Sequence, residues 1–323
     1  MKVLCGDIGG TNCRLAIARV AAQHVELERA ARYRNDEYPG LESILADFLG
    51  EDASCDACCL AVAGPTDSRT VSFTNLDWSV DADALADHFD FPRARLVNDF
   101  AAVGWGLNGV SPALLAPLQT APAQPGAPRV ALGAGTGLGV SLCAWTDGHY
   151  RPLASEGGHI GFAPVNAEQD RLLGFLRARY GRASVERILS GPGIVDLYRF
   201  CLADAGLGDT PLLDGQRPAE AISQAGLDGH DPSAAHCLRL FAQIYGQTAG
   251  DLALAARATG GVYLAGGIAP QLLPLLESGL FLEGFRAKGR FSEWMREVPV
   301  AVILDPDIGL KGAALAAVLD QSR

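Results

Sequence analysis

Short apolar runs that end in glycine mark two places in the chain as tight turns between strands. Val3-Leu4-Cys5 leads into Gly6-Asp7-Ile8-Gly9-Gly10-Thr11-Asn12, and another apolar run follows at residues 13–18. The same layout returns later, where Gly133-Ala134-Gly135-Thr136-Gly137-Leu138-Gly139 lies between two further apolar runs. Both stretches predict strand, glycine turn, strand. A dinucleotide-binding fingerprint requires a helix that opens at its last glycine, so these turns indicate a different kind of site.

The two turns have the composition of phosphate loops. Glycine lets bare backbone N–H groups approach an anion such as a nucleotide phosphate, and Thr11 and Asn12 add side-chain donors beside the first turn. A plain glycine-rich hairpin is the alternative for either turn alone. Two such hairpins in one chain indicate two related halves, each with a phosphate loop. ATP-binding folds of the actin and sugar-kinase type are built in this way.

Hydrophobic spacing in the rest of the chain predicts an alternation of strands and helices. Strands are expected at residues 25–33, 58–63, 70–75, 95–97, 261–268 and 300–304. Helices are expected at residues 41–49, 81–89, 168–180, 185–189, 232–259 and 309–319, with a further helix that opens at Pro270. Asp81 and Ser184 are expected N-caps, and Gly181 is an expected stop. The long helix presents one stripe, formed by Leu238, Phe241, Tyr245, Thr248 and Leu252.

Chain length and one composition shift indicate two domains. A chain of 323 residues is long enough to form two hydrophobic cores. Residues 112–128 are rich in Pro, Ala and Gln, and we interpret them as the crossing from one domain to the other. The Ala-rich helix expected at 309–319 would then return to pack on the first domain. Lys311, near the start of that helix, is interpreted as a surface residue.

Composition and charge exclude several classes of protein. Hydrophobic residues make up 49% of the chain and charged residues 20%, and no apolar run approaches the ~20 residues of a membrane span. The sequence enters a strand directly, without a signal peptide, so a cytoplasmic location is expected. The net charge of −11 argues against nucleic-acid binding, which relies on clustered Lys and Arg. It does not argue against ATP held by backbone N–H groups and Mg²⁺.

The eight cysteines are expected to be reduced in a cytoplasmic protein. Cys55, Cys58 and Cys59 lie close enough in sequence for a zinc site to be one interpretation. No second pair of Cys or His ligands follows nearby at metal spacing. Because Cys58 and Cys59 open an apolar run, we prefer to interpret all three as small core residues.

Three groups of polar residues are candidates for chemistry. Asn98-Asp99 follows a short strand, where a carboxylate can accept a proton from a hydroxyl that attacks phosphorus; an ordinary turn is the alternative. Glu156 and His159 share a glycine-rich loop and, with Glu186, suit a polyhydroxy ligand; a metal site and a structural histidine are the alternatives. Asp7 is either a Mg²⁺ ligand, directly or through water, or an acid that caps the turn.

These residues fall into six blocks that together resemble the bacterial ATP-dependent glucokinase family from Val3 to Leu319. The resemblance implies an α/β, ribonuclease-H-like (actin/hexokinase-type) two-domain fold with an interdomain cleft for ATP and sugar. It also implies a small α/β domain of residues 1–110 and 305–323, a large α/β domain of residues 111–304, and a homodimer. The matching blocks are Gly6–Asn12, Val97–Phe100, Gly133–Gly139, Glu156–His159, Ser184–Gly193 and Leu264–Ile268.

The same resemblance implies roles for single residues. Asp99 matches the base for the sugar 6-hydroxyl, and glucose hydroxyls are expected at Asn98, Asp99, Glu156, His159 and Glu186. The phosphate-loop positions are Gly6, Asp7, Ile8, Gly9, Gly10 and Thr11 in the first turn, and Gly133, Gly135, Thr136 and Gly137 in the second. Gly266 and Gly267 lie where the family binds the adenosine portion. The related repressor and sugar-kinase group has a zinc motif of C-x-C-G-x-x-G-C spacing, which does not follow His159 here.

The expected activity is therefore that of a glucokinase. The γ-phosphoryl group of MgATP would pass to the 6-hydroxyl of D-glucose, with ATP and Mg²⁺ as cofactors and Asp7 as the metal-binding residue. A kinase for mannose, glucosamine or N-acetylglucosamine is the alternative enzyme. A sugar-sensing regulator without turnover is the alternative from another class. No nucleic-acid or membrane partner is expected.

Overall fold

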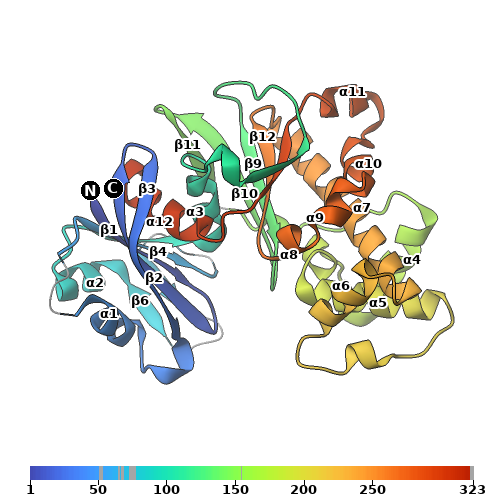
Figure 1. The fold of residues 1–323 in the computed structure, drawn as a ribbon, viewed down its shortest axis with the longest axis horizontal. Coiled ribbons are helices and arrows are strands. Elements are labelled where there is room, and N and C mark those ends of the chain that lie inside the picture. The colour runs from blue at the N-terminus through green and yellow to red at the C-terminus, as the bar shows by residue number, and fades with distance from the viewer. Residues whose placement is uncertain (51–53, 65, 67–68, 73–77, 154, 321–323) are drawn as a thin grey trace. The chain divides into compact units, whose positions relative to one another are not determined.

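The chain forms two compact units in the computed structural model, which describes all residues except 51–53, 65, 67–68, 73–77, 154 and 321–323 (Figure 1). The first unit contains residues 1–114, 141–155 and 305–323. The second contains residues 115–140 and 156–304. Residues 141–155, which the sequence-based boundaries place in the large domain, group with the first unit.

Five strands form the sheet of the first unit, in the order β3-β2-β1-β4-β7. The antiparallel meander consists of β1 (Lys2–Ile8), β2 (Asn12–Ala21) and β3 (His24–Arg34). β4 (Ala57–Val62) and β7 (Ala94–Asn98) run parallel to β1. Every residue of β4 is buried, as expected for a strand with neighbours on both sides and covered faces. The strand, glycine turn, strand predicted at the start of the chain is confirmed.

Helices cover both faces of this sheet. α1 (Leu41–Leu49) and α2 (Ala82–Phe89) contribute Leu45 and Leu85 to the core on one face. α3 (Asp99–Gly106) and α12 (Ile308–Leu319) contribute Trp105 and Leu310 to the core on the other. α3 and α12 nearly touch, because a Cβ atom on Gly312 would lie 1.7 Å from the Ala102 carbonyl oxygen. The predicted packing of the C-terminal helix on the first part of the chain is confirmed.

Three details of the first unit bear on the sequence-based expectations. Asp81 caps α2 as predicted, since its carboxylate accepts the N–H groups of residues 83 and 84 at 2.8 and 3.0 Å. The strand expected at 70–75 is seen as β5 (Thr70–Ser72), paired with β6 (Ser79–Asp81), and its last three residues lie outside the described part. All eight cysteines are buried and free, so the interpretation of residues 55, 58 and 59 as core residues is confirmed.

Lys311 is not the surface residue that the sequence suggested. Only 26% of its side chain is exposed, and its ammonium group lies 2.7 Å from the carboxylate of Asp305. Asp305 is itself buried, just before α12 begins. Lys311 therefore neutralises a buried acid, which its position near the start of an Ala-rich helix did not reveal.

The second unit is built on parallel strands. β9 (Arg129–Ala134), β12 (Gly261–Ala265) and β13 (Val300–Ile303) are parallel, and β8 (Leu115–Gln119) runs antiparallel to β13. β10 (Leu138–Thr146) starts in this unit and continues into the first, where it pairs with β11 (His149–Leu153). The full sheet order is β11-β10-β9-β12-β13-β8. The boundary between the two units, after residue 114, lies inside the predicted crossing at 112–128, and residues 115–119 of the same stretch form an edge strand.

The second unit also contains the α-helices between residues 167 and 295. They are α4 (Ala167–Tyr180), α5 (Gly191–Asp204), α6 (Pro218–Leu227), α7 (Pro232–Ala256), α8 (Ile268–Gln271), α9 (Leu273–Glu277), α10 (Leu280–Arg286) and α11 (Ser292–Met295). The predicted stripe of α7 is buried, and α10 comes so close to it that a Cβ on Gly246 would meet the Phe281 carbonyl. Among the helices of the described residues, none combines the length and the apolar character that crossing a membrane requires.

Three predicted helix ends differ from the structure. Residues 185–187 form only a 3₁₀ turn, and the Ser184 side chain makes no cap hydrogen bond although its backbone has the extended conformation of an N-cap. The helix expected to open at Pro270 begins at Ile268, since proline is tolerated within a first turn. α7 stops at Ala256, because Arg257 takes a left-handed conformation with φ of 51°.

Candidate active site

Strand register places two of the expected sequence blocks at one edge of the first sheet. Ile8 of β1 is level with Val62 of β4, and Val62 is level with Asn98 of β7. The glycine turn that follows β1 and the Asn98-Asp99 pair therefore leave the sheet at the same end. Strands are spaced at about 4.8 Å, so these two features are separated by two strand spacings, about 10 Å. Open α/β sheets bind their ligands at this carboxyl end.

Asp7 lies at the end of β1, directly opposite Arg14 of β2. Burial raises the pKa of the Asp7 carboxyl, and the Arg14 guanidinium opposes that rise. Arg14 also donates to the carbonyl of Pro306 at 3.1 Å and pairs with the carboxylate of Asp307. These contacts join the charged end of β2 to the residues that lead into α12.

Asn98 and Asp99 have different structural roles. The side-chain oxygen Oδ1 of Asn98 caps α3, because it accepts the N–H groups of Phe100 and Ala101 at 3.0 and 3.1 Å. Its amide group points toward the Gly64 carbonyl at 3.3 Å, so this side chain is committed to the fold. Asp99 is the first residue of α3, and its Oδ1 accepts the N–H of Phe100 at 2.8 Å. Asp99 thus lies in the first turn of a helix, where a carboxylate interacts favourably with the helix dipole.

The second glycine turn joins β9 to β10 and is held by hydrogen bonds from two directions. Within the turn, the Gly135 N–H donates to the Gly137 carbonyl at 2.8 Å. The N–H of Gly191, at the start of α5, donates to the Gly135 carbonyl, also at 2.8 Å. On the far side, the Leu138 N–H donates to Glu186 Oε2 at 3.0 Å. The turn is therefore fixed in shape before any ligand binds.

Glu156, His159 and Glu186 come together in the second unit, as the sequence predicted. His159 Nδ1 lies 3.7 Å from one Glu186 oxygen, and His159 Nε2 lies 4.0 Å from Glu156. The segment that carries His159 fits closely against β10, since a Cβ on Gly158 would lie 2.0 Å from the Leu138 carbonyl oxygen. Two carboxylates and an imidazole thus gather beside the second glycine turn, with the donors and acceptors that a polyhydroxy ligand requires.

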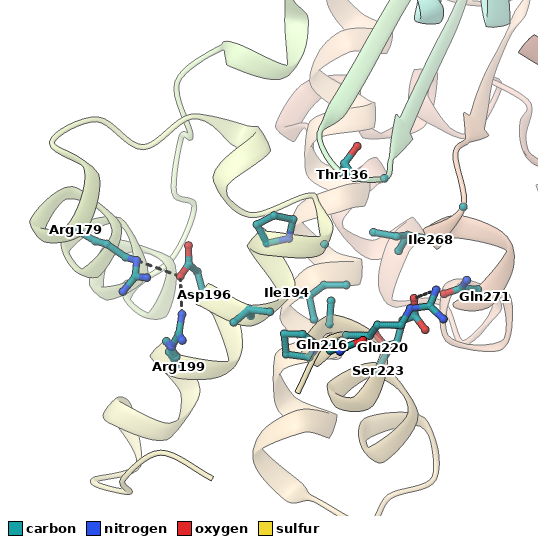
Figure 2. Close-up of a pocket in the computed structure, with 18 of the residues that line it drawn as sticks. Thr136, Arg179, Ile194, Asp196, Arg199, Gln216, Glu220, Ser223, Ile268 and Gln271 are labelled. Carbon is teal, nitrogen blue, oxygen red and sulfur yellow. Dashed lines mark ion pairs between the residues drawn. The ribbon is translucent and has the colours of Figure 1, made fainter. Parts of the chain in front are cut away.

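A cavity of about 620 Å³ also borders the second glycine turn (Figure 2). Its volume lies within the range of small-molecule sites, about 300–1,000 Å³. Gly135 and Thr136 of the turn border it, together with Gly267 and residues of α4, α5, α6 and α8. Figure 2 shows the buried carboxylate of Asp196 between Arg179 and Arg199, at 3.3 and 3.7 Å.

The sequence-based predictions include the loop glycines that border this cavity but not most of the other residues that line it. Gly266 lies close behind the loop, because a Cβ there would come 2.5 Å from the Ala134 carbonyl. Asp196, Arg179 and Gln271 were missed, since each sits inside a helix whose residues show no distinctive spacing. The block Ser190-Gly191-Pro192-Gly193 was the available signal, because it starts α5 at the edge of the cavity.

The sites fall into two groups along the chain. Asp7, the first glycine turn, Asn98 and Asp99 belong to the first unit. The second glycine turn, Gly266-Gly267 and the Glu156, His159 and Glu186 cluster belong to the second. Among the described residues, no group of three or more His, Cys, Asp or Glu side chains is placed to hold a metal ion.

Comparison with known proteins gives one consistent result. The sequence model of the glucokinase family matches residues 4–320. The glucokinase of Nostoc punctiforme is 38% identical and covers 98% of each chain, and that of Caulobacter vibrioides is 40% identical over 97% of this chain and 94% of the other. A glucokinase crystal structure from an Antarctic psychrotroph has a TM-score of 0.88 at 31% identity and covers 98% of both chains. These matches confirm the predicted actin/hexokinase-type fold, and the chain belongs to the glucokinase family of ATP-dependent hexose kinases.

Proposed function

We propose that this chain transfers the γ-phosphoryl group of ATP to the 6-hydroxyl of D-glucose, with Asp99 as the base. The observation that carries the proposal is the contact between Glu186 and the phosphate loop. The Glu186 carboxylate accepts a hydrogen bond from the Leu138 N–H at 3.0 Å and lies 3.7 Å from His159. A hydroxyl-binding cluster is thereby joined to a loop that suits phosphate, as phosphoryl transfer to a sugar requires.

On the sugar side, Glu156, His159 and Glu186 would bind hydroxyl groups of glucose. Glu186 is the best fixed of the three, since one of its oxygens is already anchored to the Leu138 backbone. Asp99 would accept the proton of the 6-hydroxyl as that oxygen attacks phosphorus. Asn98 would act mainly by holding the first turn of α3, which presents Asp99. Its direct contact with glucose stays a prediction.

On the nucleotide side, the cavity beside Gly135 and Thr136 would take the adenosine portion of ATP. The glycine turns would hold the phosphates through backbone N–H groups. A Mg²⁺ ion would neutralise charge on the phosphate oxygens, and Asp7 is the residue that fits it. One or two carboxylates are enough for Mg²⁺ that is bound mainly by phosphates and water, so a lone aspartate at the end of β1 is a suitable donor set.

The proposal is tested by measuring ADP release with MgATP against a panel of hexoses. We expect release with glucose and none with 6-deoxyglucose, which lacks the hydroxyl to be phosphorylated. Higher kcat/KM for mannose, glucosamine or N-acetylglucosamine would reassign the substrate. Tight glucose binding by calorimetry without ADP release on any sugar would replace the kinase by a sugar-sensing regulator. The homodimer, the cytoplasmic location and the small and large domain boundaries stay predictions.

A further inference from the structure

Asn35 is a buried polar residue that is not among the expected site residues. It follows β3, only 2% of it is exposed, and its side-chain oxygen Oδ1 has no hydrogen-bond partner. Buried acceptors without a partner are rare, because they lose their bonds to water on folding and gain nothing in return. The other polar group of Asn35, its side-chain amide, does have a partner.

That amide and the Asn35 backbone both bind the first glycine turn. Asn35 Nδ2 donates to the Gly9 carbonyl at 2.8 Å. The Asn35 N–H donates to the Thr11 carbonyl at 3.0 Å. One residue, 24 positions beyond Thr11 in the sequence, therefore fixes two of the carbonyl groups of the turn from its buried side.

The direction of a carbonyl group also fixes the direction of a neighbouring N–H. In a trans peptide the C=O of one residue and the N–H of the next point in opposite directions, and the peptide bonds of the turn are trans. When Asn35 draws the Gly9 carbonyl toward itself, the Gly10 N–H must point away from Asn35. Gly10 and Thr11 are exposed, so this N–H faces the side that a ligand can reach.

We propose that Asn35 is a positioning residue, which aims the Gly10 N–H of the first glycine turn at a phosphate group of the nucleotide. The inference rests on the proposed function, because it takes this turn to be a phosphate loop. Glycine turns are flexible, and an N–H that is already oriented binds an anion without a further loss of conformational entropy. Asn35 supplies that orientation from a distance and touches neither ATP nor sugar.

The test replaces Asn35 by leucine, which has a similar size and shape but no polar group. Asn35→Leu removes the amide donor and also the unpartnered oxygen, whose burial is unfavourable. The protein should therefore lose the orientation of the Gly10 N–H without a large loss of stability. We expect the KM for MgATP to rise about tenfold or more, the KM for glucose to stay within about twofold, and the melting temperature to stay near that of the wild type. Asp36→Ala is the matched control, because the neighbouring Asp36 side chain is 62% exposed and pairs with Arg34. It should leave both KM values unchanged.

A second measurement uses the wild-type protein and does not depend on the variant folding. The backbone amide signals of Gly10 and Gly109 are followed by NMR as a non-hydrolysable ATP analogue is added. Gly109 lies after α3, and its N–H is bonded to the Gly106 carbonyl, so it serves as the internal reference. We expect the Gly10 amide to shift downfield and to exchange more slowly with solvent, and the Gly109 amide to stay in place.

Equal rises in both KM values, a loss of kcat alone, or a Gly10 amide that ignores the analogue would each overturn the inference. The proposed function fails in a different way, by absence of glucose-dependent ADP release from the wild-type protein. An active wild type with an Asn35→Leu variant of unchanged KM for MgATP would leave the kinase assignment in place and remove the role of Asn35.

Discussion

Glu186 Oε2 accepts a hydrogen bond from the backbone N–H of Leu138 at 3.0 Å, across 48 residues of sequence. The same oxygen lies close to position 137, since a Cβ atom there would come within 2.6 Å of it. The carboxylate therefore serves two partners: one oxygen holds the second glycine turn, and the other lies 3.7 Å from His159. Under the proposed function, sugar binding and phosphate binding would be connected through this one side chain.

Substitution of Glu186 should separate these two roles. Glu186→Gln keeps an acceptor for the Leu138 N–H but loses the charge, so we expect a higher KM for glucose with little change in the KM for MgATP. Glu186→Ala loses both partners, so both KM values should rise, each by about tenfold to a hundredfold, since hydrogen bonds to charged groups contribute about 1.5–3 kcal/mol. Steady-state kinetics with each substrate varied in turn would check this. Identical KM values for MgATP in the two variants would contradict the connection.

Asp99 should affect turnover far more than sugar binding. Asp99→Asn keeps an oxygen that can accept the Phe100 N–H, so the start of α3 is preserved. The amide cannot take up a proton at neutral pH, and we expect kcat to fall by roughly 10²–10⁴-fold, the usual contribution of a general base. Asp99→Ala should lose a similar factor. Calorimetry should show glucose affinity within a few-fold of the wild type, and a variant with near-normal turnover would remove Asp99 from its role as base.

The sequence predicted the local parts of this protein well. Each glycine turn is recognisable from a short run of residues, because strand, turn and strand are set by neighbours in the chain. The cap at Asp81 is predictable for the same reason. The failed N-cap at Ser184 shows the limit: this residue pairs with Gly161, which lies 23 residues earlier, and its side chain makes no cap hydrogen bond.

Features that depend on distant partners could not be predicted from spacing. Lys311 looks like a surface lysine until Asp305 is found buried beside it. Asn35 looks like an ordinary turn residue until its contacts with the Gly9 carbonyl are seen. The resemblance to the family supplied Glu186 as a glucose-binding position, but not its bond to Leu138. Local patterns thus identified the candidate residues, and the fold showed what holds them in place.

Arg14 should control the ionisation of Asp7. The two residues face each other across β1 and β2, and the guanidinium keeps the raised pKa of the buried Asp7 carboxyl from rising further. Arg14→Gln removes that cation, so the acidic limb of the pH profile of kcat/KM for MgATP should move to higher pH. Arg14→Lys keeps the charge and should move the limb less. Measuring kcat/KM for MgATP between pH 5 and 8 for the wild type, Arg14→Gln and Arg14→Lys would check which variant shifts the acidic limb further. An acidic limb that stays in place in Arg14→Gln would argue against an ionised Asp7 in the reaction.

Asp7 should also lower the stability of the protein at neutral pH. Burial raises the pKa of its carboxyl in the folded state above that in the unfolded chain, about 3.9. The unfolded state therefore releases its proton first, and the free energy of unfolding falls as pH rises from the unfolded pKa through the folded one. Asp7→Asn removes this ionisation. The variant should gain stability relative to the wild type as pH rises from 4 to 7.5, while its kcat/KM for MgATP falls at least tenfold. Urea unfolding at several pH values gives the difference in free energy of unfolding between Asp7→Asn and the wild type. If this difference decreased with rising pH, the ionised Asp7 carboxylate would be stabilised by its surroundings, contrary to the prediction.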